Sequence, residues 1–161
     1  MEILEVKQVN DALAEMVALF RVELRSYKGI KSKPNIEAGR EEIEEYLSAK
    51  FPVYAALVDG EYAGYVVCRV DSEVVWVESI FVKEEYRRHG VATALHSKAE
   101  EIAASYGDDT VYNYVHPNNH RMIEFLRKRG YTVLNLIEIR KPCKDEKLTQ
   151  TIAVGEHEFD Y

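Results

Sequence analysis

The run Trp76-Val-Glu-Ser-Ile-Phe-Val82, followed shortly by Tyr86-Arg-Arg-His-Gly-Val-Ala-Thr-Ala-Leu95, decides the fold of this chain. The first run is rich in β-branched and aromatic residues and predicts a strand, whereas the residues from Val91 onward are spaced like a helix. A basic turn centred on Gly90 separates the two. The first N–H groups of a helix lack intrahelical partners and carry partial positive charge. Strand, turn and helix together therefore form a place to hold a phosphate.

The glycine spacing excludes the two best-known phosphate loops. Neither the P-loop pattern nor the three-glycine dinucleotide fingerprint occurs in the chain. What occurs is Arg87-x-x-Gly90-x-Ala92. This pattern resembles the acetyl-CoA signature of the GNAT N-acetyltransferases, which is Gln/Arg-x-x-Gly-x-Gly/Ala after a strand ending in an aliphatic residue. Further positions that match this resemblance are Val82, Tyr86 and Leu95.

A second segment, from Asn119 to Tyr131, resembles the other GNAT hallmark. Asn119 opens it, and the pair Gly130-Tyr131 closes it at the family distance. In the family this helix lines the channel for the acyl-CoA arm, and a tyrosine four residues before the glycine acts as general acid toward the leaving thiolate. Leu126 occupies that position here. Because general acid assistance is typically worth roughly 10²- to 10⁴-fold, we expect slower catalysis; water, Tyr112, Tyr114 or Tyr131 are the candidate substitutes.

The rest of the chain predicts an α+β layout in the order β-α-α-β-β-β-α-β-α-β. This order matches the GNAT family from about residue 2 to residue 141, and the resemblance implies the GNAT-like acyl-CoA N-acyltransferase fold, a mixed, mostly antiparallel sheet flanked by helices. We therefore expect one domain over 1–141 and a tail over 142–161. In the tail, Ile152 to Val154 would either add a strand or contact a second subunit in a homodimer. The expected strands cover 2–8, 53–58, 62–70, 73–82, 110–115 and 131–140, and the expected helices cover 10–26, 36–49, 91–106 and 119–129.

Composition limits the partners. The 21 basic and 28 acidic residues give a net charge of −7, which argues against nucleic acid because no positive field is available. The apolar runs are too short to span a bilayer and no leader opens the chain, so we expect no membrane partner and a cytoplasmic protein. Cys68 and Cys143 fit neither a disulfide framework nor a metal-ligand spacing, and the five histidines share no such spacing. We expect no metal.

The resemblance implies that acetyl-CoA is the cosubstrate and that its acetyl group passes to a primary amine by direct attack. The strand edge would pair with the pantetheine arm, and one of its N–H groups would polarise the thioester carbonyl. The turn and helix start would hold the pyrophosphate, chiefly through backbone N–H groups. The residues assigned to the cofactor are Ile80, Phe81, Val82, Arg87, Arg88, His89, Gly90, Val91, Ala92, Thr93 and Asn119.

An ammonium acceptor must lose a proton before it attacks. Glu78 is the first candidate base, because a carboxylate inside a strand is out of place unless it faces solvent or a cleft. The alternative is an outward-facing strand residue. His116, just before Pro117, is the second candidate because an imidazole titrates near neutral pH, and the alternative is a loop histidine.

Three functional classes remain open at this point, and the last of them, a phosphate-binding scaffold unrelated to acetylation, would leave the segment from Asn119 to Tyr131 unexplained. The first is an N-acetyltransferase acting on a small molecule or on a protein amino group. The second is an acyl-CoA-binding sensor with little or no turnover, favoured by Leu126 at the tyrosine position. The acceptor pocket would involve residues 27–34 and the acidic run near Glu41, which suits a cationic amine, but the sequence carries no code for one acceptor.

Overall fold

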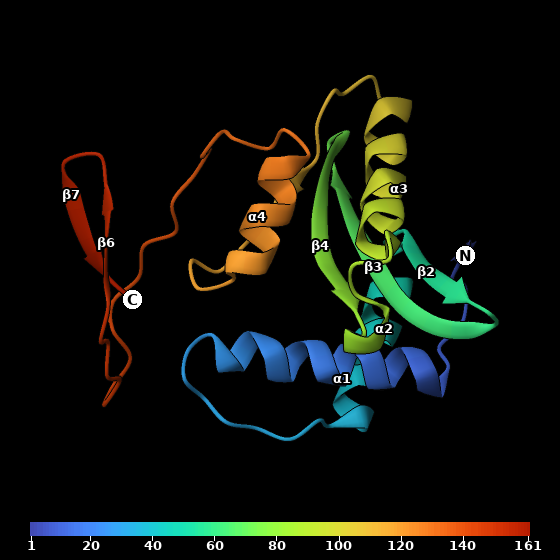
Figure 1. Cartoon of the computed structure of the whole chain (residues 1–161), viewed down its shortest axis with the longest axis horizontal. Coiled ribbons are helices and arrows are strands. Elements are labelled where there is room, and N and C mark those ends of the chain that lie inside the picture. The colour runs from blue at the N-terminus through green and yellow to red at the C-terminus, as the bar shows by residue number, and fades with distance from the viewer. The chain divides into compact units, whose positions relative to one another are not determined.

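The residues between 53 and 82 form the centre of a five-stranded sheet (Figure 1) in the computed structural model, which describes residues 1–161. The strand order is β1-β2-β3-β4-β5, and all pairs are antiparallel except β4 and β5, which run parallel. The predicted mixed, mostly antiparallel sheet is confirmed. The strands are β1 (Glu2–Glu5), β2 (Val53–Val58), β3 (Glu61–Asp71), β4 (Val74–Val82) and β5 (Tyr112–Asn113).

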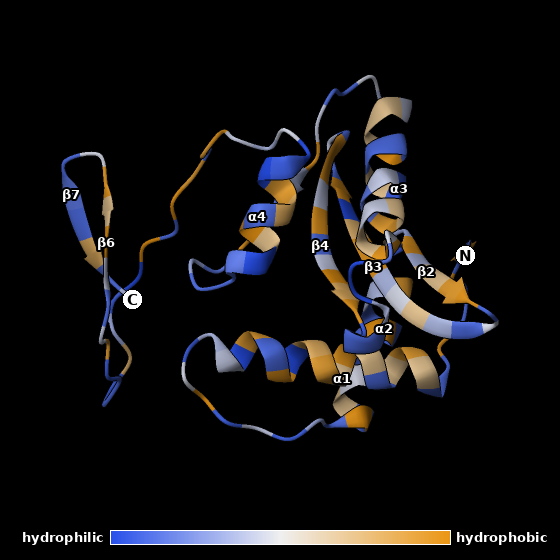
Figure 2. Cartoon of the chain, in the orientation of Figure 1, coloured by the Kyte–Doolittle hydropathy of each residue, from blue (hydrophilic) through white to orange (hydrophobic).

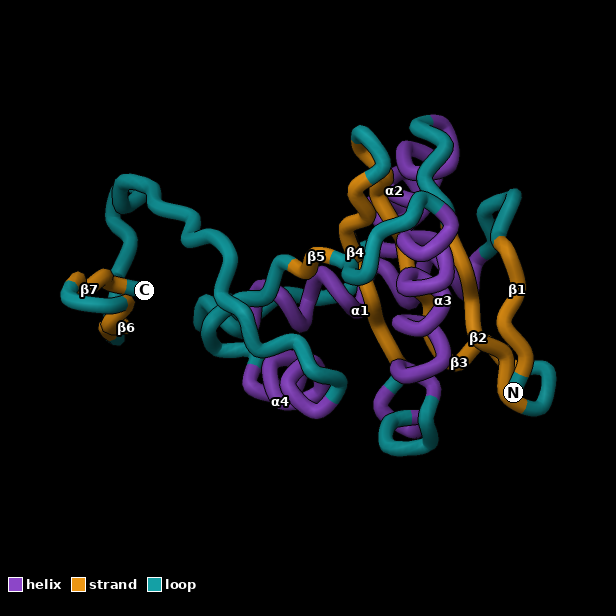
Figure 3. The backbone as a smooth tube through the Cα atoms, turned by 90° about the horizontal axis from the view of Figure 1, so that it is seen from above, coloured by secondary structure: helices purple, strands orange, loops and turns teal.

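Four α-helices and one short 3-10 helix accompany these strands (Figure 3). An asparagine side chain caps three of them by accepting a hydrogen bond from the backbone N–H three residues further on, which satisfies a donor at the helix start. These pairs are Asn10 with Leu13, Asn35 with Ala38, and Asn119 with Met122. The helices are α1 (Asp11–Ser26), α2 (Ile36–Ser48), η1 (Glu84–Tyr86), α3 (Val91–Ser105) and α4 (His120–Lys128).

The helices α1 and α2 pack together on one face of the sheet. Their buried side chains form a core with Tyr65 of β3 and Phe81 of β4. Gly39 permits the helix contact, because a Cβ at this position would lie 2.3 Å from the carbonyl oxygen of Ala14. On the other face, Leu95 of α3 approaches Gly64, where a Cβ would lie 3.2 Å from the Leu95 Cδ1 atom. The sheet is thus covered on both faces.

Two strand predictions differ from the structure. The run 110–115 contributes only the two-residue β5, and the run 131–140 contains no strand, so the predicted closing strands are wrong. The run 131–140 is rich in apolar residues, as the orange stretch after α4 in Figure 2 shows, but such a run makes a strand only where a ladder partner is available. Val133 is 86% exposed and Leu134 is 70% exposed.

The structure divides into two compact units, Met1–Phe125 and Leu126–Tyr161. The second unit ends in a hairpin of β6 (Thr151–Val154) and β7 (His157–Asp160), which form a two-stranded antiparallel sheet of their own. Ile152 to Val154 are therefore in a strand, paired with β7.

The two cysteines have opposite surroundings. Cys68 is buried in β3, and burial raises the pKa of its thiol to about 12. Cys143 lies exposed in the second unit.

Candidate active site

One edge of β4 is open over its last residues. The β5 ladder pairs only with Trp76 and Val77, so the edge beyond them has no strand partner. The Lys83 N–H donates to the Ala63 carbonyl at 2.9 Å. Because the amide groups of an antiparallel strand alternate in direction, Val82 and Ile80 turn their backbone groups away from β3, toward this open edge.

Phe81 differs from its two neighbours. Its side chain is 7% exposed and belongs to the core, and its amide groups face β3 by the same alternation. Of the three strand residues assigned to the cofactor, Ile80 and Val82 therefore face the open edge, where the Val82 carbonyl accepts from Arg87 Nε, whereas Phe81 supports the strand from inside.

Glu78 is the extra residue of a β-bulge. Val67 pairs with Ser79 and Cys68 pairs with Val77, so Glu78 has no partner on β3. Such a bulge bends the strand and redirects a side chain, and it accounts for the short β4–β5 ladder. The Glu78 carboxylate lies 3.2 Å from the Arg69 Nε atom and its side chain is 31% exposed.

The surroundings of Glu78 include a second titratable group on α2. The pKa of the Tyr46 phenol is raised, first by burial, then by the hydrogen bond that it donates to Glu42, and also by the negative charge of Glu78. The negative charge of Glu78 is thus felt by Tyr46, on the side of the sheet that α1 and α2 cover. The structure places this carboxylate half-buried and ion-paired.

The basic turn presents a cluster of backbone donors. Arg88 and Gly90 both have positive φ, at 67° and 81°, and Gly90 precedes α3. The first intrahelical hydrogen bond runs from the Ala94 N–H to the Gly90 carbonyl. The N–H groups of Val91, Ala92 and Thr93 consequently lack intrahelical acceptors, which makes this turn a site for an anion.

Glycine is required at position 90 by its conformation. A Cβ built there meets no atom within 4 Å, so crowding by the protein is absent. Any residue other than glycine would be strained by the left-handed backbone conformation at this position. The side chains of Arg88 and His89 are exposed beside it.

Arg87 points inward. Its Nε donates to the Val82 carbonyl at 2.9 Å, and its Nη2 donates to the Glu23 Oε2 atom at 2.9 Å. The guanidinium also lies over the Phe81 ring, 5.8 Å from the centroid. The first residue of the acetyl-CoA pattern therefore fastens the end of β4 with its side chain.

His116 is held by its neighbours. Its ring stacks on Tyr27 with centroids 6.0 Å apart, and its Nδ1 accepts a hydrogen bond from the Asn118 N–H at 3.1 Å. Burial lowers the pKa of His116, with a further contribution from the positive charge of Lys28. Because the Nδ1 lone pair is engaged, the neutral ring carries its proton on Nε2.

A model of the acetyltransferase (GNAT) family matches residues 16–131, which include both signatures and the bulged strand. The chain belongs to the GNAT acetyltransferase family. An N-alpha-acetyltransferase of Sulfurisphaera tokodaii is 30% identical over 114 residues, covering 60% of this chain and 64% of the relative. An uncharacterized N-acetyltransferase of Methanocaldococcus jannaschii is 33% identical over 81 residues, covering 46% of this chain and 36% of the relative. The chain thus spans less than two thirds of each of these relatives.

Comparison with solved structures also identifies the GNAT fold. The aminoglycoside N-acetyltransferase AAC(6')-Iy, solved with a bisubstrate analogue, superimposes with a TM-score of 0.63 at 22% identity and covers 88% of this chain and 98% of that one. The predicted GNAT-like α+β fold is confirmed.

In this GNAT chain, Asn119 of the second signature forms hydrogen bonds within its own segment. Asn119 caps α4 with its side chain, and its N–H donates to the His116 carbonyl. Leu126 is 7% exposed and offers no proton.

No group of three or more His, Cys, Asp or Glu side chains is arranged to hold a metal ion. None of the helices combines the length and the apolar composition needed to cross a bilayer.

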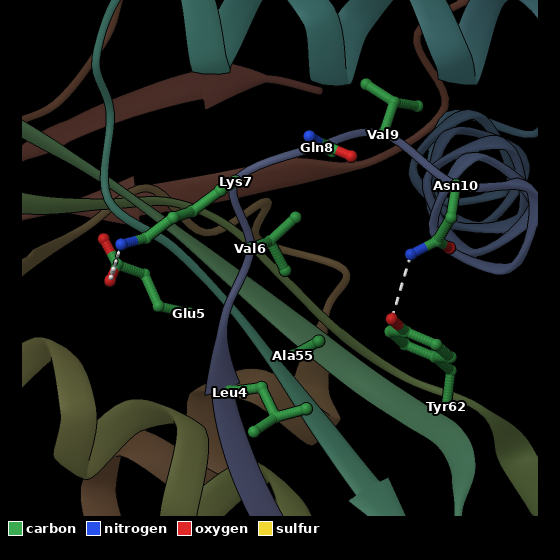
Figure 4. A pocket seen from close by; sticks show the side chains of 9 residues that line it. All are labelled: Leu4, Glu5, Val6, Lys7, Gln8, Val9, Asn10, Ala55 and Tyr62. Carbon is green, nitrogen blue, oxygen red and sulfur yellow. Dashed lines mark hydrogen bonds and ion pairs between the residues drawn. The ribbon is translucent and has the colours of Figure 1, made fainter.

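Two hollows lie in the first unit. One, of about 280 Å³, lies between the end of β1 and the start of α1, where the Asn10 side chain donates to the Tyr62 hydroxyl (Figure 4). It borders β1, at the opposite edge of the sheet from β5. The other, of about 380 Å³, follows the end of α1. Its lining residues are Val22, Ser26, Gly29, Ile30, Lys31 and Ser32.

Sequence reasoning missed Glu23 and Arg69, and it placed Tyr27 in the acceptor segment 27–34 without predicting its contact with Glu23. The Tyr27 hydroxyl donates to Glu23 four residues earlier, at 2.9 Å, a helix spacing that sequence does reveal. The pairs Glu23–Arg87 and Arg69–Glu78 join residues brought together by the fold. Neither signature contains Glu23 or Arg69.

Proposed function

We propose that this chain transfers an acetyl group from acetyl-CoA to a primary amine, which attacks the thioester directly. One observation carries the proposal: the open β4 edge at Ile80 and Val82 leads through the turn to the donor-rich start of α3 at Gly90. An extended arm with amide groups can pair with a strand edge, and phosphates attached to that arm can then reach the helix N–H groups. The N-acetyltransferase names of the relatives support the same reaction.

Glu78 is proposed as the base that takes the proton from the ammonium. The bulge directs it out of the ladder, and the Arg69 Nε atom lies 3.2 Å from its carboxylate. His116 is the weaker candidate, because its Nδ1 lone pair already accepts from the Asn118 N–H. A half-buried carboxylate at the open strand is thus the better arranged acceptor for the proton.

The thioester carbonyl would be polarised by a backbone N–H of the open edge. Such a donor stabilises the negative charge that develops on the oxygen during attack. The leaving thiolate receives no proton from Leu126, so its protonation falls to water or to one of the tyrosines at 112, 114 and 131. Of these, Tyr114 is 61% exposed and stacks on Trp76 with centroids 4.8 Å apart.

The acceptor is proposed to enter near the hollow after α1. Its lining includes Lys31 and no carboxylate, so an attraction for a cationic amine would come from Glu78 and from the acidic face of α2. The S. tokodaii relative is named an N-alpha-acetyltransferase and the AAC(6')-Iy enzyme an aminoglycoside N-acetyltransferase. Both acceptors are amines, and they mark the two classes to test.

Calorimetric titration with acetyl-CoA and with CoA, followed by a CoA-release assay, tests the proposal. The acceptor panel would hold aminoglycosides, polyamines, amino acids and peptides with free N-termini. Binding with CoA release on any amine supports the transferase. Binding without release on every amine favours the sensor alternative, which the apolar Leu126 at the usual tyrosine position supports. Absence of binding would contradict both.

A further inference from the structure

Glu23, near the end of α1, receives donors from three separate parts of the chain. The Tyr27 hydroxyl donates to its Oε1 atom at 2.9 Å, the Arg87 Nη2 donates to its Oε2 atom at 2.9 Å, and Arg121 of α4 also pairs with Oε1. The Glu23 side chain is only 22% exposed. Figure 1 shows the C-terminal end of α1 near the start of α4, the two elements that carry Glu23 and Arg121.

Two of these donors belong to the cofactor signatures. Arg87 opens the first pattern, and Arg121 stands two residues after Asn119 in the second. Arg87 uses Nε on the Val82 carbonyl and Nη2 on Glu23, so its guanidinium is fixed in two directions. A planar guanidinium held by two acceptors has a defined orientation. The position of Arg87, and with it the end of the open β4 edge, therefore depends on Glu23.

The same junction reaches the acceptor side. Tyr27 donates to Glu23, its carbonyl accepts from the Asn118 side chain at 2.9 Å, and its ring stacks on His116. The hollow after α1 begins one residue before Glu23, at Val22, and continues beyond Tyr27. Glu23 thus joins the turn, α4 and the segment after α1.

We propose that Glu23 is a positioning residue for acetyl-CoA, which acts by orienting Arg87 and by fastening Arg121 so that the two signature segments keep their places beside the open strand edge. The inference rests on the proposed function. In this role Glu23 contacts the two arginines and no reacting atom. Its effect passes through the two arginines.

If Glu23 acts only through its negative charge, Glu23→Gln changes CoA affinity in one direction, and if Glu23 orients Arg87, the same substitution changes it in the opposite direction. CoA is an anion, so removing a nearby negative charge would strengthen its binding if Glu23 acted only through its field. If Glu23 orients Arg87, the substitution Glu23→Gln weakens binding despite the more positive site. Glu23→Asp keeps the charge and shortens the reach, so a field effect leaves CoA affinity unchanged and a positioning effect lowers it.

The test is calorimetric titration of CoA into wild type, Glu23→Gln, Glu23→Asp and Glu15→Gln, with thermal unfolding to check that each is folded. Glu15→Gln is the matched control, because it removes the same charge from an exposed position of α1. We expect roughly tenfold weaker CoA binding for both Glu23 variants and no change for the control. In turnover, KM for acetyl-CoA should rise more than kcat falls.

A double-variant cycle identifies the route. If part of the effect of Glu23 passes through Arg87, the combined Glu23→Gln, Arg87→Gln protein loses less CoA affinity than the two single losses added together, and fully additive losses overturn the Arg87 route. Unchanged or tighter binding by both Glu23 variants overturns the positioning role alone. Failure of the wild-type protein to bind CoA overturns the proposed function as well, so the two failures are distinguishable.

Discussion

At the scale of a single residue, Glu78 combines two features that suit a general base. The bulge releases it from the ladder, and Arg69 keeps a positive charge 3.2 Å away. The side chain of Glu78 is 31% exposed, so its carboxylate is reachable. The residue is therefore suited to remove a proton without being needed for cofactor binding.

Glu78→Gln should lower kcat/KM by roughly 10²- to 10⁴-fold, because the amide keeps the side chain's shape but cannot take a proton. Affinity for CoA should stay within about twofold, since general-base loss leaves ground-state binding intact. Loss of the acid limb of the pH–rate profile in the variant is the decisive measurement. Glu73→Gln, an exposed carboxylate before the same strand, serves as control. An unchanged profile in Glu78→Gln would move the base to His116.

His116 should make stability depend on pH. Its pKa is lowered in the folded chain by burial and by Lys28, so the unfolded chain binds the proton more readily. The stabilisation is fully present above the unfolded value near about 6.5 and is lost as the pH falls through the folded value. Denaturant unfolding of wild type and His116→Gln at about pH 8 and about pH 5 should show the larger loss in wild type. Equal losses in the two proteins would contradict this.

The sequence predicted the local structure around single residues where backbone conformation or local spacing decides it. Gly90, Asn119 and Ile80 lie where the family pattern and helix-start rules place them. The inward orientation of Arg87 could not be predicted, because it depends on Glu23, 64 positions away in the sequence. The occupied lone pair of His116 likewise depends on how the loop folds at Asn118.

At the scale of an element, the turn before α3 depends on a left-handed glycine. Gly90→Gln should cost roughly 1–2 kcal/mol of folding free energy from the backbone alone, and should weaken CoA binding at least about tenfold because the N–H groups at the helix start are displaced. Thermal unfolding and CoA titration measure the two effects separately.

Gly60 provides the matched control for that variant. It has φ of 84° in the β2–β3 turn, and a Cβ there also meets no atom within 4 Å. Gly60→Gln should therefore lose similar stability and keep its CoA affinity. Wild-type CoA affinity in folded Gly90→Gln would contradict the assignment of the turn to the phosphates.

Element prediction succeeded for helices and for the central strands, because helix caps and the alternation between 53 and 82 are local signals. It failed at 110–115 and at 131–140, where a run of apolar and aromatic residues forms a strand only beside a partner strand. The bulge at Glu78 bends β4 away after two paired residues, and no pattern within 110–115 indicates this. Strand formation there is decided by the neighbouring element.

For the whole molecule, the exposed apolar run at 131–140 predicts self-association. Val133, Leu134 and Leu136 are 86%, 70% and 69% exposed, and an exposed apolar segment without a ladder partner favours pairing with another chain. Light scattering should give twice the chain mass of 18.6 kDa. Leu134→Lys combined with Leu136→Lys should give the monomer, while Thr132→Lys in the same segment should not. A monomeric wild type would contradict the homodimer.

The opposite surroundings of Cys68 and Cys143 bear on how the protein can be studied. A colorimetric thiol reagent used to follow CoA release would react with one protein sulfur per folded chain, at Cys143, and give a constant background equal to the enzyme concentration. The same selectivity makes Cys143 a natural attachment point for a single maleimide dye, so that the second unit can carry a fluorescent reporter while the sheet keeps its native side chains.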